Sequence, residues 1–357
     1  SHNMMNERNH DVELSSDILA PVISGHTEQI AFILRSIKKN KIPNAWLFHG
    51  PLGIGKASLA LNVAKILSNI DLTKPRYGSG ISESDIRNPK TSFNLNNVFH
   101  CKRKWDDKKK VFQKYISIDD IRELNKRFSL SSTDHSYKVC VIDTTEDLNL
   151  SASNSLLKIL EEPPKNTLFI LVSNNQQAIL PTILSRCQKV GFEKLEEQSL
   201  REISAEIFKK NQFSDLEEAN FLSSCEGSAR KLINFLDKDY IDFFNDMKTL
   251  LSNLPNINRR HMITLLAKNR EYLYSNDPDK SAFGIILRLI GSIAKQENVL
   301  RINKSIKPSD TSLIAAHLYS QISLLRHYSI EYNVDMKKVV FLALTTIELA
   351  FEKYKQR

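Results

Sequence analysis

The sequence predicts an α/β domain, built on a mostly parallel β-sheet flanked by helices, followed by two all-helical domains. In the first half of the chain, short apolar runs rich in branched and aromatic residues alternate with segments whose apolar residues recur at helical spacing. This alternation is typical of a parallel sheet covered by helices. After Phe192 only the helical spacing continues. We therefore expect the strands to end near this point.

The expected domain limits follow from this change of pattern. We expect the sheet domain at residues 21–193, a small helical domain at 194–238 and a second helical domain at 239–357. Residues 1–20 are expected to form an N-terminal tail, of which 1–3 are an expression remnant.

The first elements surround a glycine-rich turn. Residues 45–49 form a short apolar run that ends at a glycine, and 56–67 follow with apolar residues on one helical stripe. These segments predict a strand, a loop and a helix. Between 68 and 117 the periodicity fades, and the charged stretch 102–110 is interpreted as a solvated loop.

Further elements complete the expected sheet domain. They are a helix at 118–128, a buried strand at 139–142 that ends at Asp143, a helix at 151–162 stopped by Pro163 and Pro164, and a strand at 167–172. The regular change between strand and helix supports the prediction of a parallel sheet.

The composition is that of a globular chain without a membrane span. Of the 357 residues, 41% are apolar and 25% are charged, and apolar runs such as 168–172 fall far short of the roughly 18 residues that a membrane-spanning helix needs. The start of the chain carries no secretory signal pattern. The formal net charge of +9 favours polyanions such as DNA as partners, although many basic proteins bind none.

The cysteines give no pattern for a metal site or a disulfide framework. Cys101, Cys140, Cys187 and Cys225 are separated by tens of residues, and no CxxC pair is present. We therefore expect no zinc and no other metal, reduced thiols and a cytoplasmic location.

Residues 50–57, GPLGIGKA, resemble the phosphate-binding loop of P-loop ATPases. Gly50, Gly53 and Gly55 let the backbone amides and the start of the following helix surround phosphate oxygens. Lys56 is expected to reach the terminal phosphates. The predicted strand before the loop and the predicted helix after it supply the context that this motif needs.

Two positions that hydrolysis depends on carry unsuitable residues. Ala57 stands where a Ser or Thr hydroxyl normally binds magnesium. Asp143, at the end of a predicted strand, matches the second acidic motif, but its neighbour Thr144 replaces the glutamate that usually acts as base. Glu146 is an alternative base, two residues further on. We expect a site that holds ATP or ADP and hydrolyses little of it.

Three further polar residues are candidates for contact with phosphate. Asn174 follows a strand, where it would sense a terminal phosphate or simply end the strand. Arg186, in the tripeptide SRC, would stabilise phosphoryl charge. Arg230, in the segment GSAR, would reach a bound phosphate from the small helical domain or lie at the surface as an ordinary arginine.

The stretch 143–187 resembles the clamp-loader ATPases of the AAA+ family. Members carry the pattern NxLLKxLEEPP followed by SRC, and the matching residues here are Asn154, Leu156, Leu157, Lys158, Leu160, Glu161, Glu162, Pro163, Pro164, Ser185, Arg186 and Cys187. The resemblance extends over about 21–236. It implies an AAA+ P-loop domain at 21–193, a helical lid at 194–238 and a helical collar at 239–357 through which subunits join into a ring.

The resemblance also implies a role. The motor subunits of this family, gamma and tau, keep the loop hydroxyl, an Asp-Glu pair and a four-cysteine zinc module, whereas this chain has Ala57, Thr144 and only Cys101 in the corresponding region. Loss of these residues with retention of SRC is the pattern of the family's non-hydrolysing stator. Such a subunit would join gamma or tau and delta to load the beta sliding clamp onto primed DNA.

In that reading, Arg186 is an arginine finger that acts in trans on the ATP site of a neighbouring motor subunit. An active gamma-like or tau-like motor remains the main alternative, and it would need Ser58 or Glu146 to replace the missing groups. A P-loop kinase for a small acceptor is a more distant alternative, which the segment 154–164 disfavours.

Overall fold

The computed structural model describes most of the chain. The described residues are 23–91, 94, 96–106, 108, 111–129, 135–208, 222, 225–234, 237–275, 279–295, 308–332 and 334–355. The N-terminal tail expected at 1–20 lies outside these residues. The chain divides into two compact units, with the boundary between Ile233 and Asn234.

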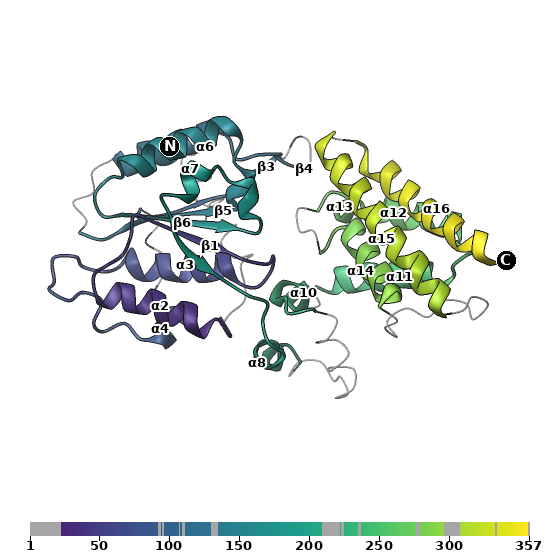
Figure 1. The fold of residues 1–357 in the computed structure, drawn as a ribbon, viewed down its shortest axis with the longest axis horizontal. Helices are drawn as coiled ribbons and strands as arrows, with labels where there is room; N and C mark the ends of the chain where they lie inside the picture. Colours follow the sequence, from purple (N-terminus) through teal and green to yellow (C-terminus); the bar gives the residue numbers. More distant parts are fainter. Residues whose placement is uncertain are drawn as a thin grey trace. The chain divides into compact units, whose positions relative to one another are not determined.

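A five-stranded parallel sheet forms the centre of the first unit (Figure 1). The strands are β1 (Ala45–His49), β2 (Val98–Cys101), β5 (Lys138–Asp143), β6 (Thr167–Ser173) and β7 (Gln188–Gly191). Their order is β2-β5-β6-β1-β7, and every neighbouring pair is parallel. The sequence prediction of a parallel sheet is confirmed, and the three expected strands are its three central strands.

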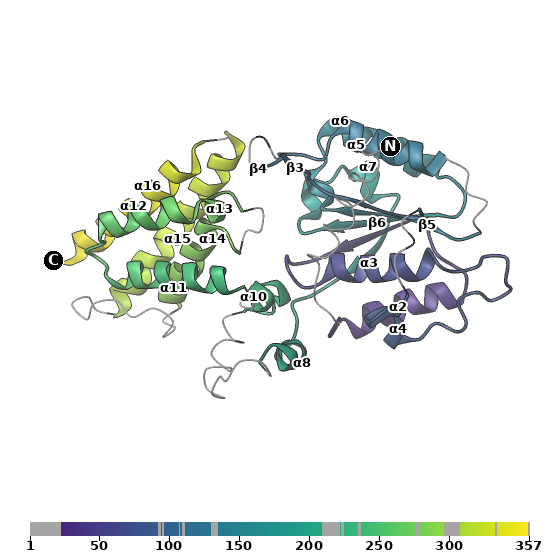
Figure 2. The same ribbon diagram turned by 180° about the vertical axis from the view of Figure 1, so that it is seen from behind.

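Helices cover both faces of this sheet. The helices before the second unit are, in chain order, α2 (Thr27–Lys38), α3 (Lys56–Leu67), α4 (Glu83–Arg87), α5 (Ile118–Ser129), α6 (Leu150–Glu161), α7 (Pro181–Leu184), α8 (Glu197–Phe208) and α10 (Ala229–Asn234). Helices α2, α3 and α4 lie on one side and α5, α6 and α7 on the other (Figures 1 and 2).

Alternation along β1 explains the two layers. Trp46 and Phe48 point into the core that contains α2 and α3, while Leu47 points into the core that contains α5 and α6. Successive side chains of a strand leave the sheet on opposite faces. All three residues are fully buried, so both faces of the sheet need a helical cover.

The charged stretch 102–110 is not the plain loop that its composition predicts. It contains strand β3 (Trp105–Asp106), which pairs antiparallel with β4 (Val111–Phe112) just after the stretch. Two of its cations form ion pairs, Lys104 with Asp120 at 2.6 Å and Arg103 with Asp147 at 3.2 Å. The charge pattern of the stretch alone does not predict these ion pairs, because the carboxylates lie elsewhere in the sequence.

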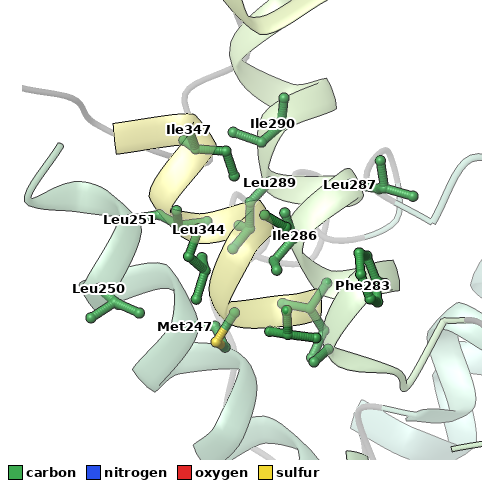
Figure 3. Packing of buried hydrophobic residues seen from close by; sticks show 14 of the residues in the cluster. Met247, Leu250, Leu251, Phe283, Ile286, Leu287, Leu289, Ile290, Leu344 and Ile347 are labelled. Carbon is green, nitrogen blue, oxygen red and sulfur yellow. The ribbon is translucent and has the colours of Figure 1, made fainter. Parts of the chain in front are cut away.

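The regular structure of the second unit is entirely helical in its described residues. Its helices are α11 (Lys238–Ser252), α12 (Arg259–Lys268), α13 (Arg270–Leu273), α14 (Ala282–Ala294), α15 (Pro308–Glu331) and α16 (Met336–Lys355). Side chains from α11, α14 and α16 meet in one apolar core, as Met247, Phe283 and Leu344 show in Figure 3. Across the described parts of both units, no helix combines the length and the apolar character that crossing a membrane requires.

Candidate functional site

The carboxyl ends of three neighbouring strands bring the candidate residues together. In the register of the sheet, His49 of β1 lies beside Ser173 of β6, and Asp143 of β5 lies beside Val172. The glycine-rich loop follows His49, and Asn174 follows Ser173. The loop, Asp143 and Asn174 therefore share the sheet edge at which open parallel sheets bind their ligands.

The loop backbone depends on glycine. Gly53 has φ of 78° and Gly55 has φ of 99°, and Gly55 is the residue directly before α3. Residues other than glycine rarely adopt such backbone angles. At Gly53 a Cβ atom would also lie 2.6 Å from Ser228 Oγ and 2.9 Å from Arg230 Cβ.

Lys56 is turned into the protein. Its residue is 3% exposed, and its Nζ donates hydrogen bonds to the Gly50 carbonyl oxygen at 2.8 Å, to Asn174 Oδ1 at 3.0 Å and to the Pro51 carbonyl oxygen. The ammonium group of Lys56 thus already donates to two carbonyl oxygens of its own loop and to the side-chain amide oxygen of Asn174. The predicted residues Gly50, Lys56 and Asn174 form one hydrogen-bonded group.

Burial lowers the pKa of Lys56 to about 8, against the opposing attraction of Asp143 and Glu146. Burial disfavours the charged form of a lysine, and nearby carboxylates favour it. Since the pKa lies close to physiological pH, a dianionic ligand that reached Lys56 would stabilise its charged form. The site is therefore electrostatically suited to phosphate.

Magnesium does not fit the residues present. Ala57 has no side-chain oxygen and packs against the apolar core, and Asp143 Oδ2 lies 3.6 Å from His100 Nε2. Burial raises the pKa of Asp143, but the charge of His100, with further charge from Arg230, outweighs burial and lowers it. Within the described residues, no cluster of three or more His, Cys, Asp or Glu could hold a metal ion.

The position of the catalytic base holds a hydroxyl that is already bonded. Thr144 Oγ1 donates to Asp147 Oδ2 at 3.0 Å. Glu146 Oε1 accepts the backbone N–H groups of Asn174 at 2.7 Å and Asn175 at 3.1 Å. Glu146 Oε2 is buried and has no hydrogen-bond partner among the described residues. Glu146 therefore braces the end of β6 through one oxygen.

The segment with Arg230 lies directly on the glycine-rich loop. The carbonyl oxygen of Gly53 accepts a hydrogen bond from the Arg230 backbone N–H at 2.9 Å and one from Ser228 Oγ at 3.3 Å. The charge of Arg230 also lies close enough to lower the pKa values of Lys56 and Asp143. The structure places Arg230 against the glycine-rich loop that precedes Lys56.

Arg186 lies apart from this group, at the protein surface just after α7. Its side chain is 35% exposed; Nη1 donates to the Thr182 carbonyl oxygen at 2.9 Å, and Nη2 pairs with Glu161 Oε1 at 2.8 Å. A 3₁₀ turn at Gln176–Ala178 precedes α7, which begins at Pro181. Proline is favoured at the first position of a helix, so it accounts for the start of α7 at this residue.

Sequence reasoning missed two residues of these sites. His100 lies on β2, an edge strand with a half-exposed burial pattern that gave no periodic signal. Glu161 belongs to the quoted motif, but its pairing with Arg186, 25 positions away, has no signature in local spacing. The chain's fold, and not its sequence pattern, brings each to its partner.

Comparison with known proteins places the first unit. Residues 25–196 match the family described as DNA polymerase III, delta subunit. DNA polymerase III subunit delta' of Bacillus subtilis is 30% identical over 172 residues, which cover 48% of this chain and 48% of that protein. DNA polymerase III subunit tau of the same organism is 28% identical over 220 residues, 59% of this chain and 36% of that protein.

One solved structure shares the fold along most of the chain. A DNA polymerase III gamma subunit-related protein from Thermotoga maritima has a TM-score of 0.50 at 17% identity, covering 92% of this chain and 99% of that chain. At that identity the likeness concerns the fold alone. The chain spans less than half the length of the two Bacillus subtilis relatives.

Proposed function

We propose that this chain, which belongs to the clamp-loader subunit family of DNA polymerase III, is a delta-prime subunit that does not itself hydrolyse ATP. In this role it is the stator of a loader that contains gamma or tau and delta, and that places the beta sliding clamp on primed DNA. Its contribution to catalysis is Arg186, acting on ATP bound by a neighbouring motor subunit.

The observation that carries the proposal is the state of the hydrolytic positions beside Asp143. Thr144 cannot accept a proton at neutral pH, and its hydroxyl is bonded to Asp147. Ala57 offers magnesium no oxygen. The phosphate-binding backbone and Lys56 are retained, which supports binding of ATP or ADP without turnover.

The position of Arg186 supports action in trans. Its side chain is 35% exposed just after α7, where a second subunit can approach it. A guanidinium that stabilises developing phosphoryl charge is a recurrent part of phosphoryl-transfer sites, and it is often supplied by a partner. The SRC tripeptide gives the side chain this assignment through the family resemblance.

The second unit supports assembly into a larger complex. Several large apolar side chains on or just after α15 and α16 are exposed. They are Leu313, Tyr319, Leu324, Tyr328, Tyr332, Leu342 and Leu349. An excess of exposed large apolar side chains on neighbouring helices is a feature of protein contact surfaces. A collar that joins loader subunits accounts for them.

The proposal is tested by measuring ATP hydrolysis twice, with the isolated chain and with a loader assembled with and without it. We expect no turnover from the isolated chain above that of a Lys56→Ala variant. We expect DNA-stimulated hydrolysis and clamp loading by the complete loader, and loss of both without this chain. Steady hydrolysis by the isolated chain that Lys56→Ala abolishes contradicts the stator role.

One observation favours the alternative of an active motor. Glu146 Oε2 is buried without a hydrogen-bond partner among the described residues, and the charge of Glu146 acts on Lys56. In such a motor, Glu146 would be the base and Ser58 would replace the missing hydroxyl. Glu146→Gln separates the two functions. It would abolish ATP hydrolysis if this chain is a motor, and it would leave ATP hydrolysis by the assembled loader unchanged if this chain is a stator.

A further inference from the structure

The two halves of the motif that identifies the family are joined by one ion pair. Glu161 is the last residue of α6, and Arg186 follows α7. Glu161 Oε1 lies 2.8 Å from Arg186 Nη2, with 45% of the Glu161 side chain and 35% of the Arg186 side chain exposed. The carboxylate at the LEEPP end of the motif thus contacts the arginine of SRC.

A second contact complements the ion pair. Arg186 Nη1 donates to the carbonyl oxygen of Thr182 at 2.9 Å. The two acceptors come from different helices, α6 and α7, and they engage the two terminal nitrogens of the guanidinium. Since the guanidinium is planar and rigid, two such anchors fix the orientation of its plane.

This anchoring matters because an unanchored arginine at a surface samples many rotamers. Arg loses more side-chain entropy on ordering than almost any other residue, and a group that is already oriented loses less when it meets its ligand. The backbone oxygen of Thr182 is present whatever the side chain at that position. Glu161 is therefore the anchor that the sequence specifies.

We propose that Glu161 is a positioning residue for Arg186: its carboxylate holds the guanidinium in the orientation in which it meets the phosphates of ATP in a neighbouring subunit. The inference rests on the proposed trans role of Arg186 and adds to it the residue that prepares the arginine. Glu161 touches no reacting atom, and it acts only through Arg186.

The test is the steady-state kinetics of DNA-stimulated ATP hydrolysis in the fully assembled loader. Glu161→Gln removes the charge and keeps the shape. We expect kcat to fall about threefold to fivefold with little change in KM for ATP, because an exposed ion pair is weak and the arginine acts on the transition state. Glu161→Ala, which removes the hydrogen bond as well, should lower kcat at least as much.

Two comparisons separate positioning from a merely structural role. Glu162→Gln removes the same charge from the adjacent exposed residue, and it should leave kcat within about twofold, the range of a neutral surface change. In a loader that already carries Arg186→Ala, Glu161→Gln should have no further effect, because the group it positions is gone. Thermal unfolding of each variant and its elution with the other subunits monitor folding and assembly.

Each contrary result has its own meaning. If Arg186→Ala leaves hydrolysis unchanged, the proposed trans role itself is wrong. If Arg186→Ala lowers hydrolysis but Glu161→Gln does not, the positioning role alone is overturned. A rise in kcat with Glu161→Gln would mean that the carboxylate sequesters the arginine, and an equal loss in the Arg186→Ala background would mean a structural effect. Both results overturn the inference.

Discussion

The two cationic groups that we propose for ATP chemistry, Lys56 and Arg186, are held in opposite ways. Lys56 is 3% exposed and donates to three oxygens, two of them from its own loop. Arg186 keeps 35% of its side chain exposed and is held from the side by α6 and α7. One cation is enclosed within the fold, and the other is presented at its surface.

This difference indicates where each cation can work. A ligand that reaches Lys56 must displace hydrogen bonds that already satisfy a buried ammonium group, so the loop binds phosphate only at the expense of those bonds. Arg186 can meet a ligand on another chain without any rearrangement of the core. The geometry is consistent with a subunit whose contribution lies at its boundary.

The largest test of this comparison is removal of the surface cation. Arg186→Ala in the assembled loader should lower kcat for DNA-stimulated ATP hydrolysis by about 10³-fold or more, because arginine fingers contribute about 10³ to 10⁵ in rate. The measurement is turnover at saturating ATP and DNA. Arg122→Ala, which removes an exposed arginine from α5, is the matched control.

The next test concerns how firmly the enclosed site is tied to the segment that carries Arg230. Gly53→Ala should lower the free energy of unfolding by about 1–3 kcal/mol more than Gly55→Ala. Both positions have positive φ, but a Cβ at Gly53 meets Ser228 and Arg230, whereas a Cβ at Gly55 meets nothing within 4 Å. Chemical denaturation measures the difference, and equal losses would contradict a tight contact.

The sequence predicted the centre of this site and missed its margins for a physical reason. Strands β1, β5 and β6 are buried on both faces, so each reads as a continuous apolar run that sequence analysis detects. The edge strands β2 and β7 are short and partly exposed, and they carry no such pattern. His100 was missed together with β2.

The contacts of the two cations show the second limit. The motifs predict Lys56 and Arg186 as functional residues, but they do not predict that Lys56 turns inward or that Glu161 holds Arg186. These depend on tertiary contacts between segments up to 118 positions apart. A motif therefore indicates which residues are candidates for function, but it does not predict the tertiary contacts that their side chains make.

A smaller effect tests the electrostatics of the enclosed cation. Because burial lowers the pKa of Lys56 to about 8, raising the pH from 7 to 9 deprotonates it and removes the charge that attracts phosphate. We expect affinity for ADP, measured by calorimetry, to fall about tenfold over this range, from the fraction of lysine that stays charged. Lys56→Arg keeps its charge throughout, and its affinity should not follow this trend.

An ADP affinity of the unchanged chain that stays constant from pH 7 to 9 would contradict the lowered pKa of the buried Lys56. So would a fall of equal size in the Lys56→Arg variant, since the titrating group would then lie elsewhere. Undetectable ADP binding at pH 7 would show that the loop serves only as structure.

The smallest expected effect concerns magnesium. Ala57 supplies no oxygen, and Asp143 is already engaged by His100 at 3.6 Å, so chelating magnesium with EDTA should change affinity for ADP less than about twofold, which is under roughly 0.5 kcal/mol. Ala57→Ser restores the hydroxyl that P-loop ATPases use for the metal, and it should increase the effect of magnesium. Strong magnesium dependence in the unchanged chain would instead favour a complete hydrolytic site, and with it the active motor.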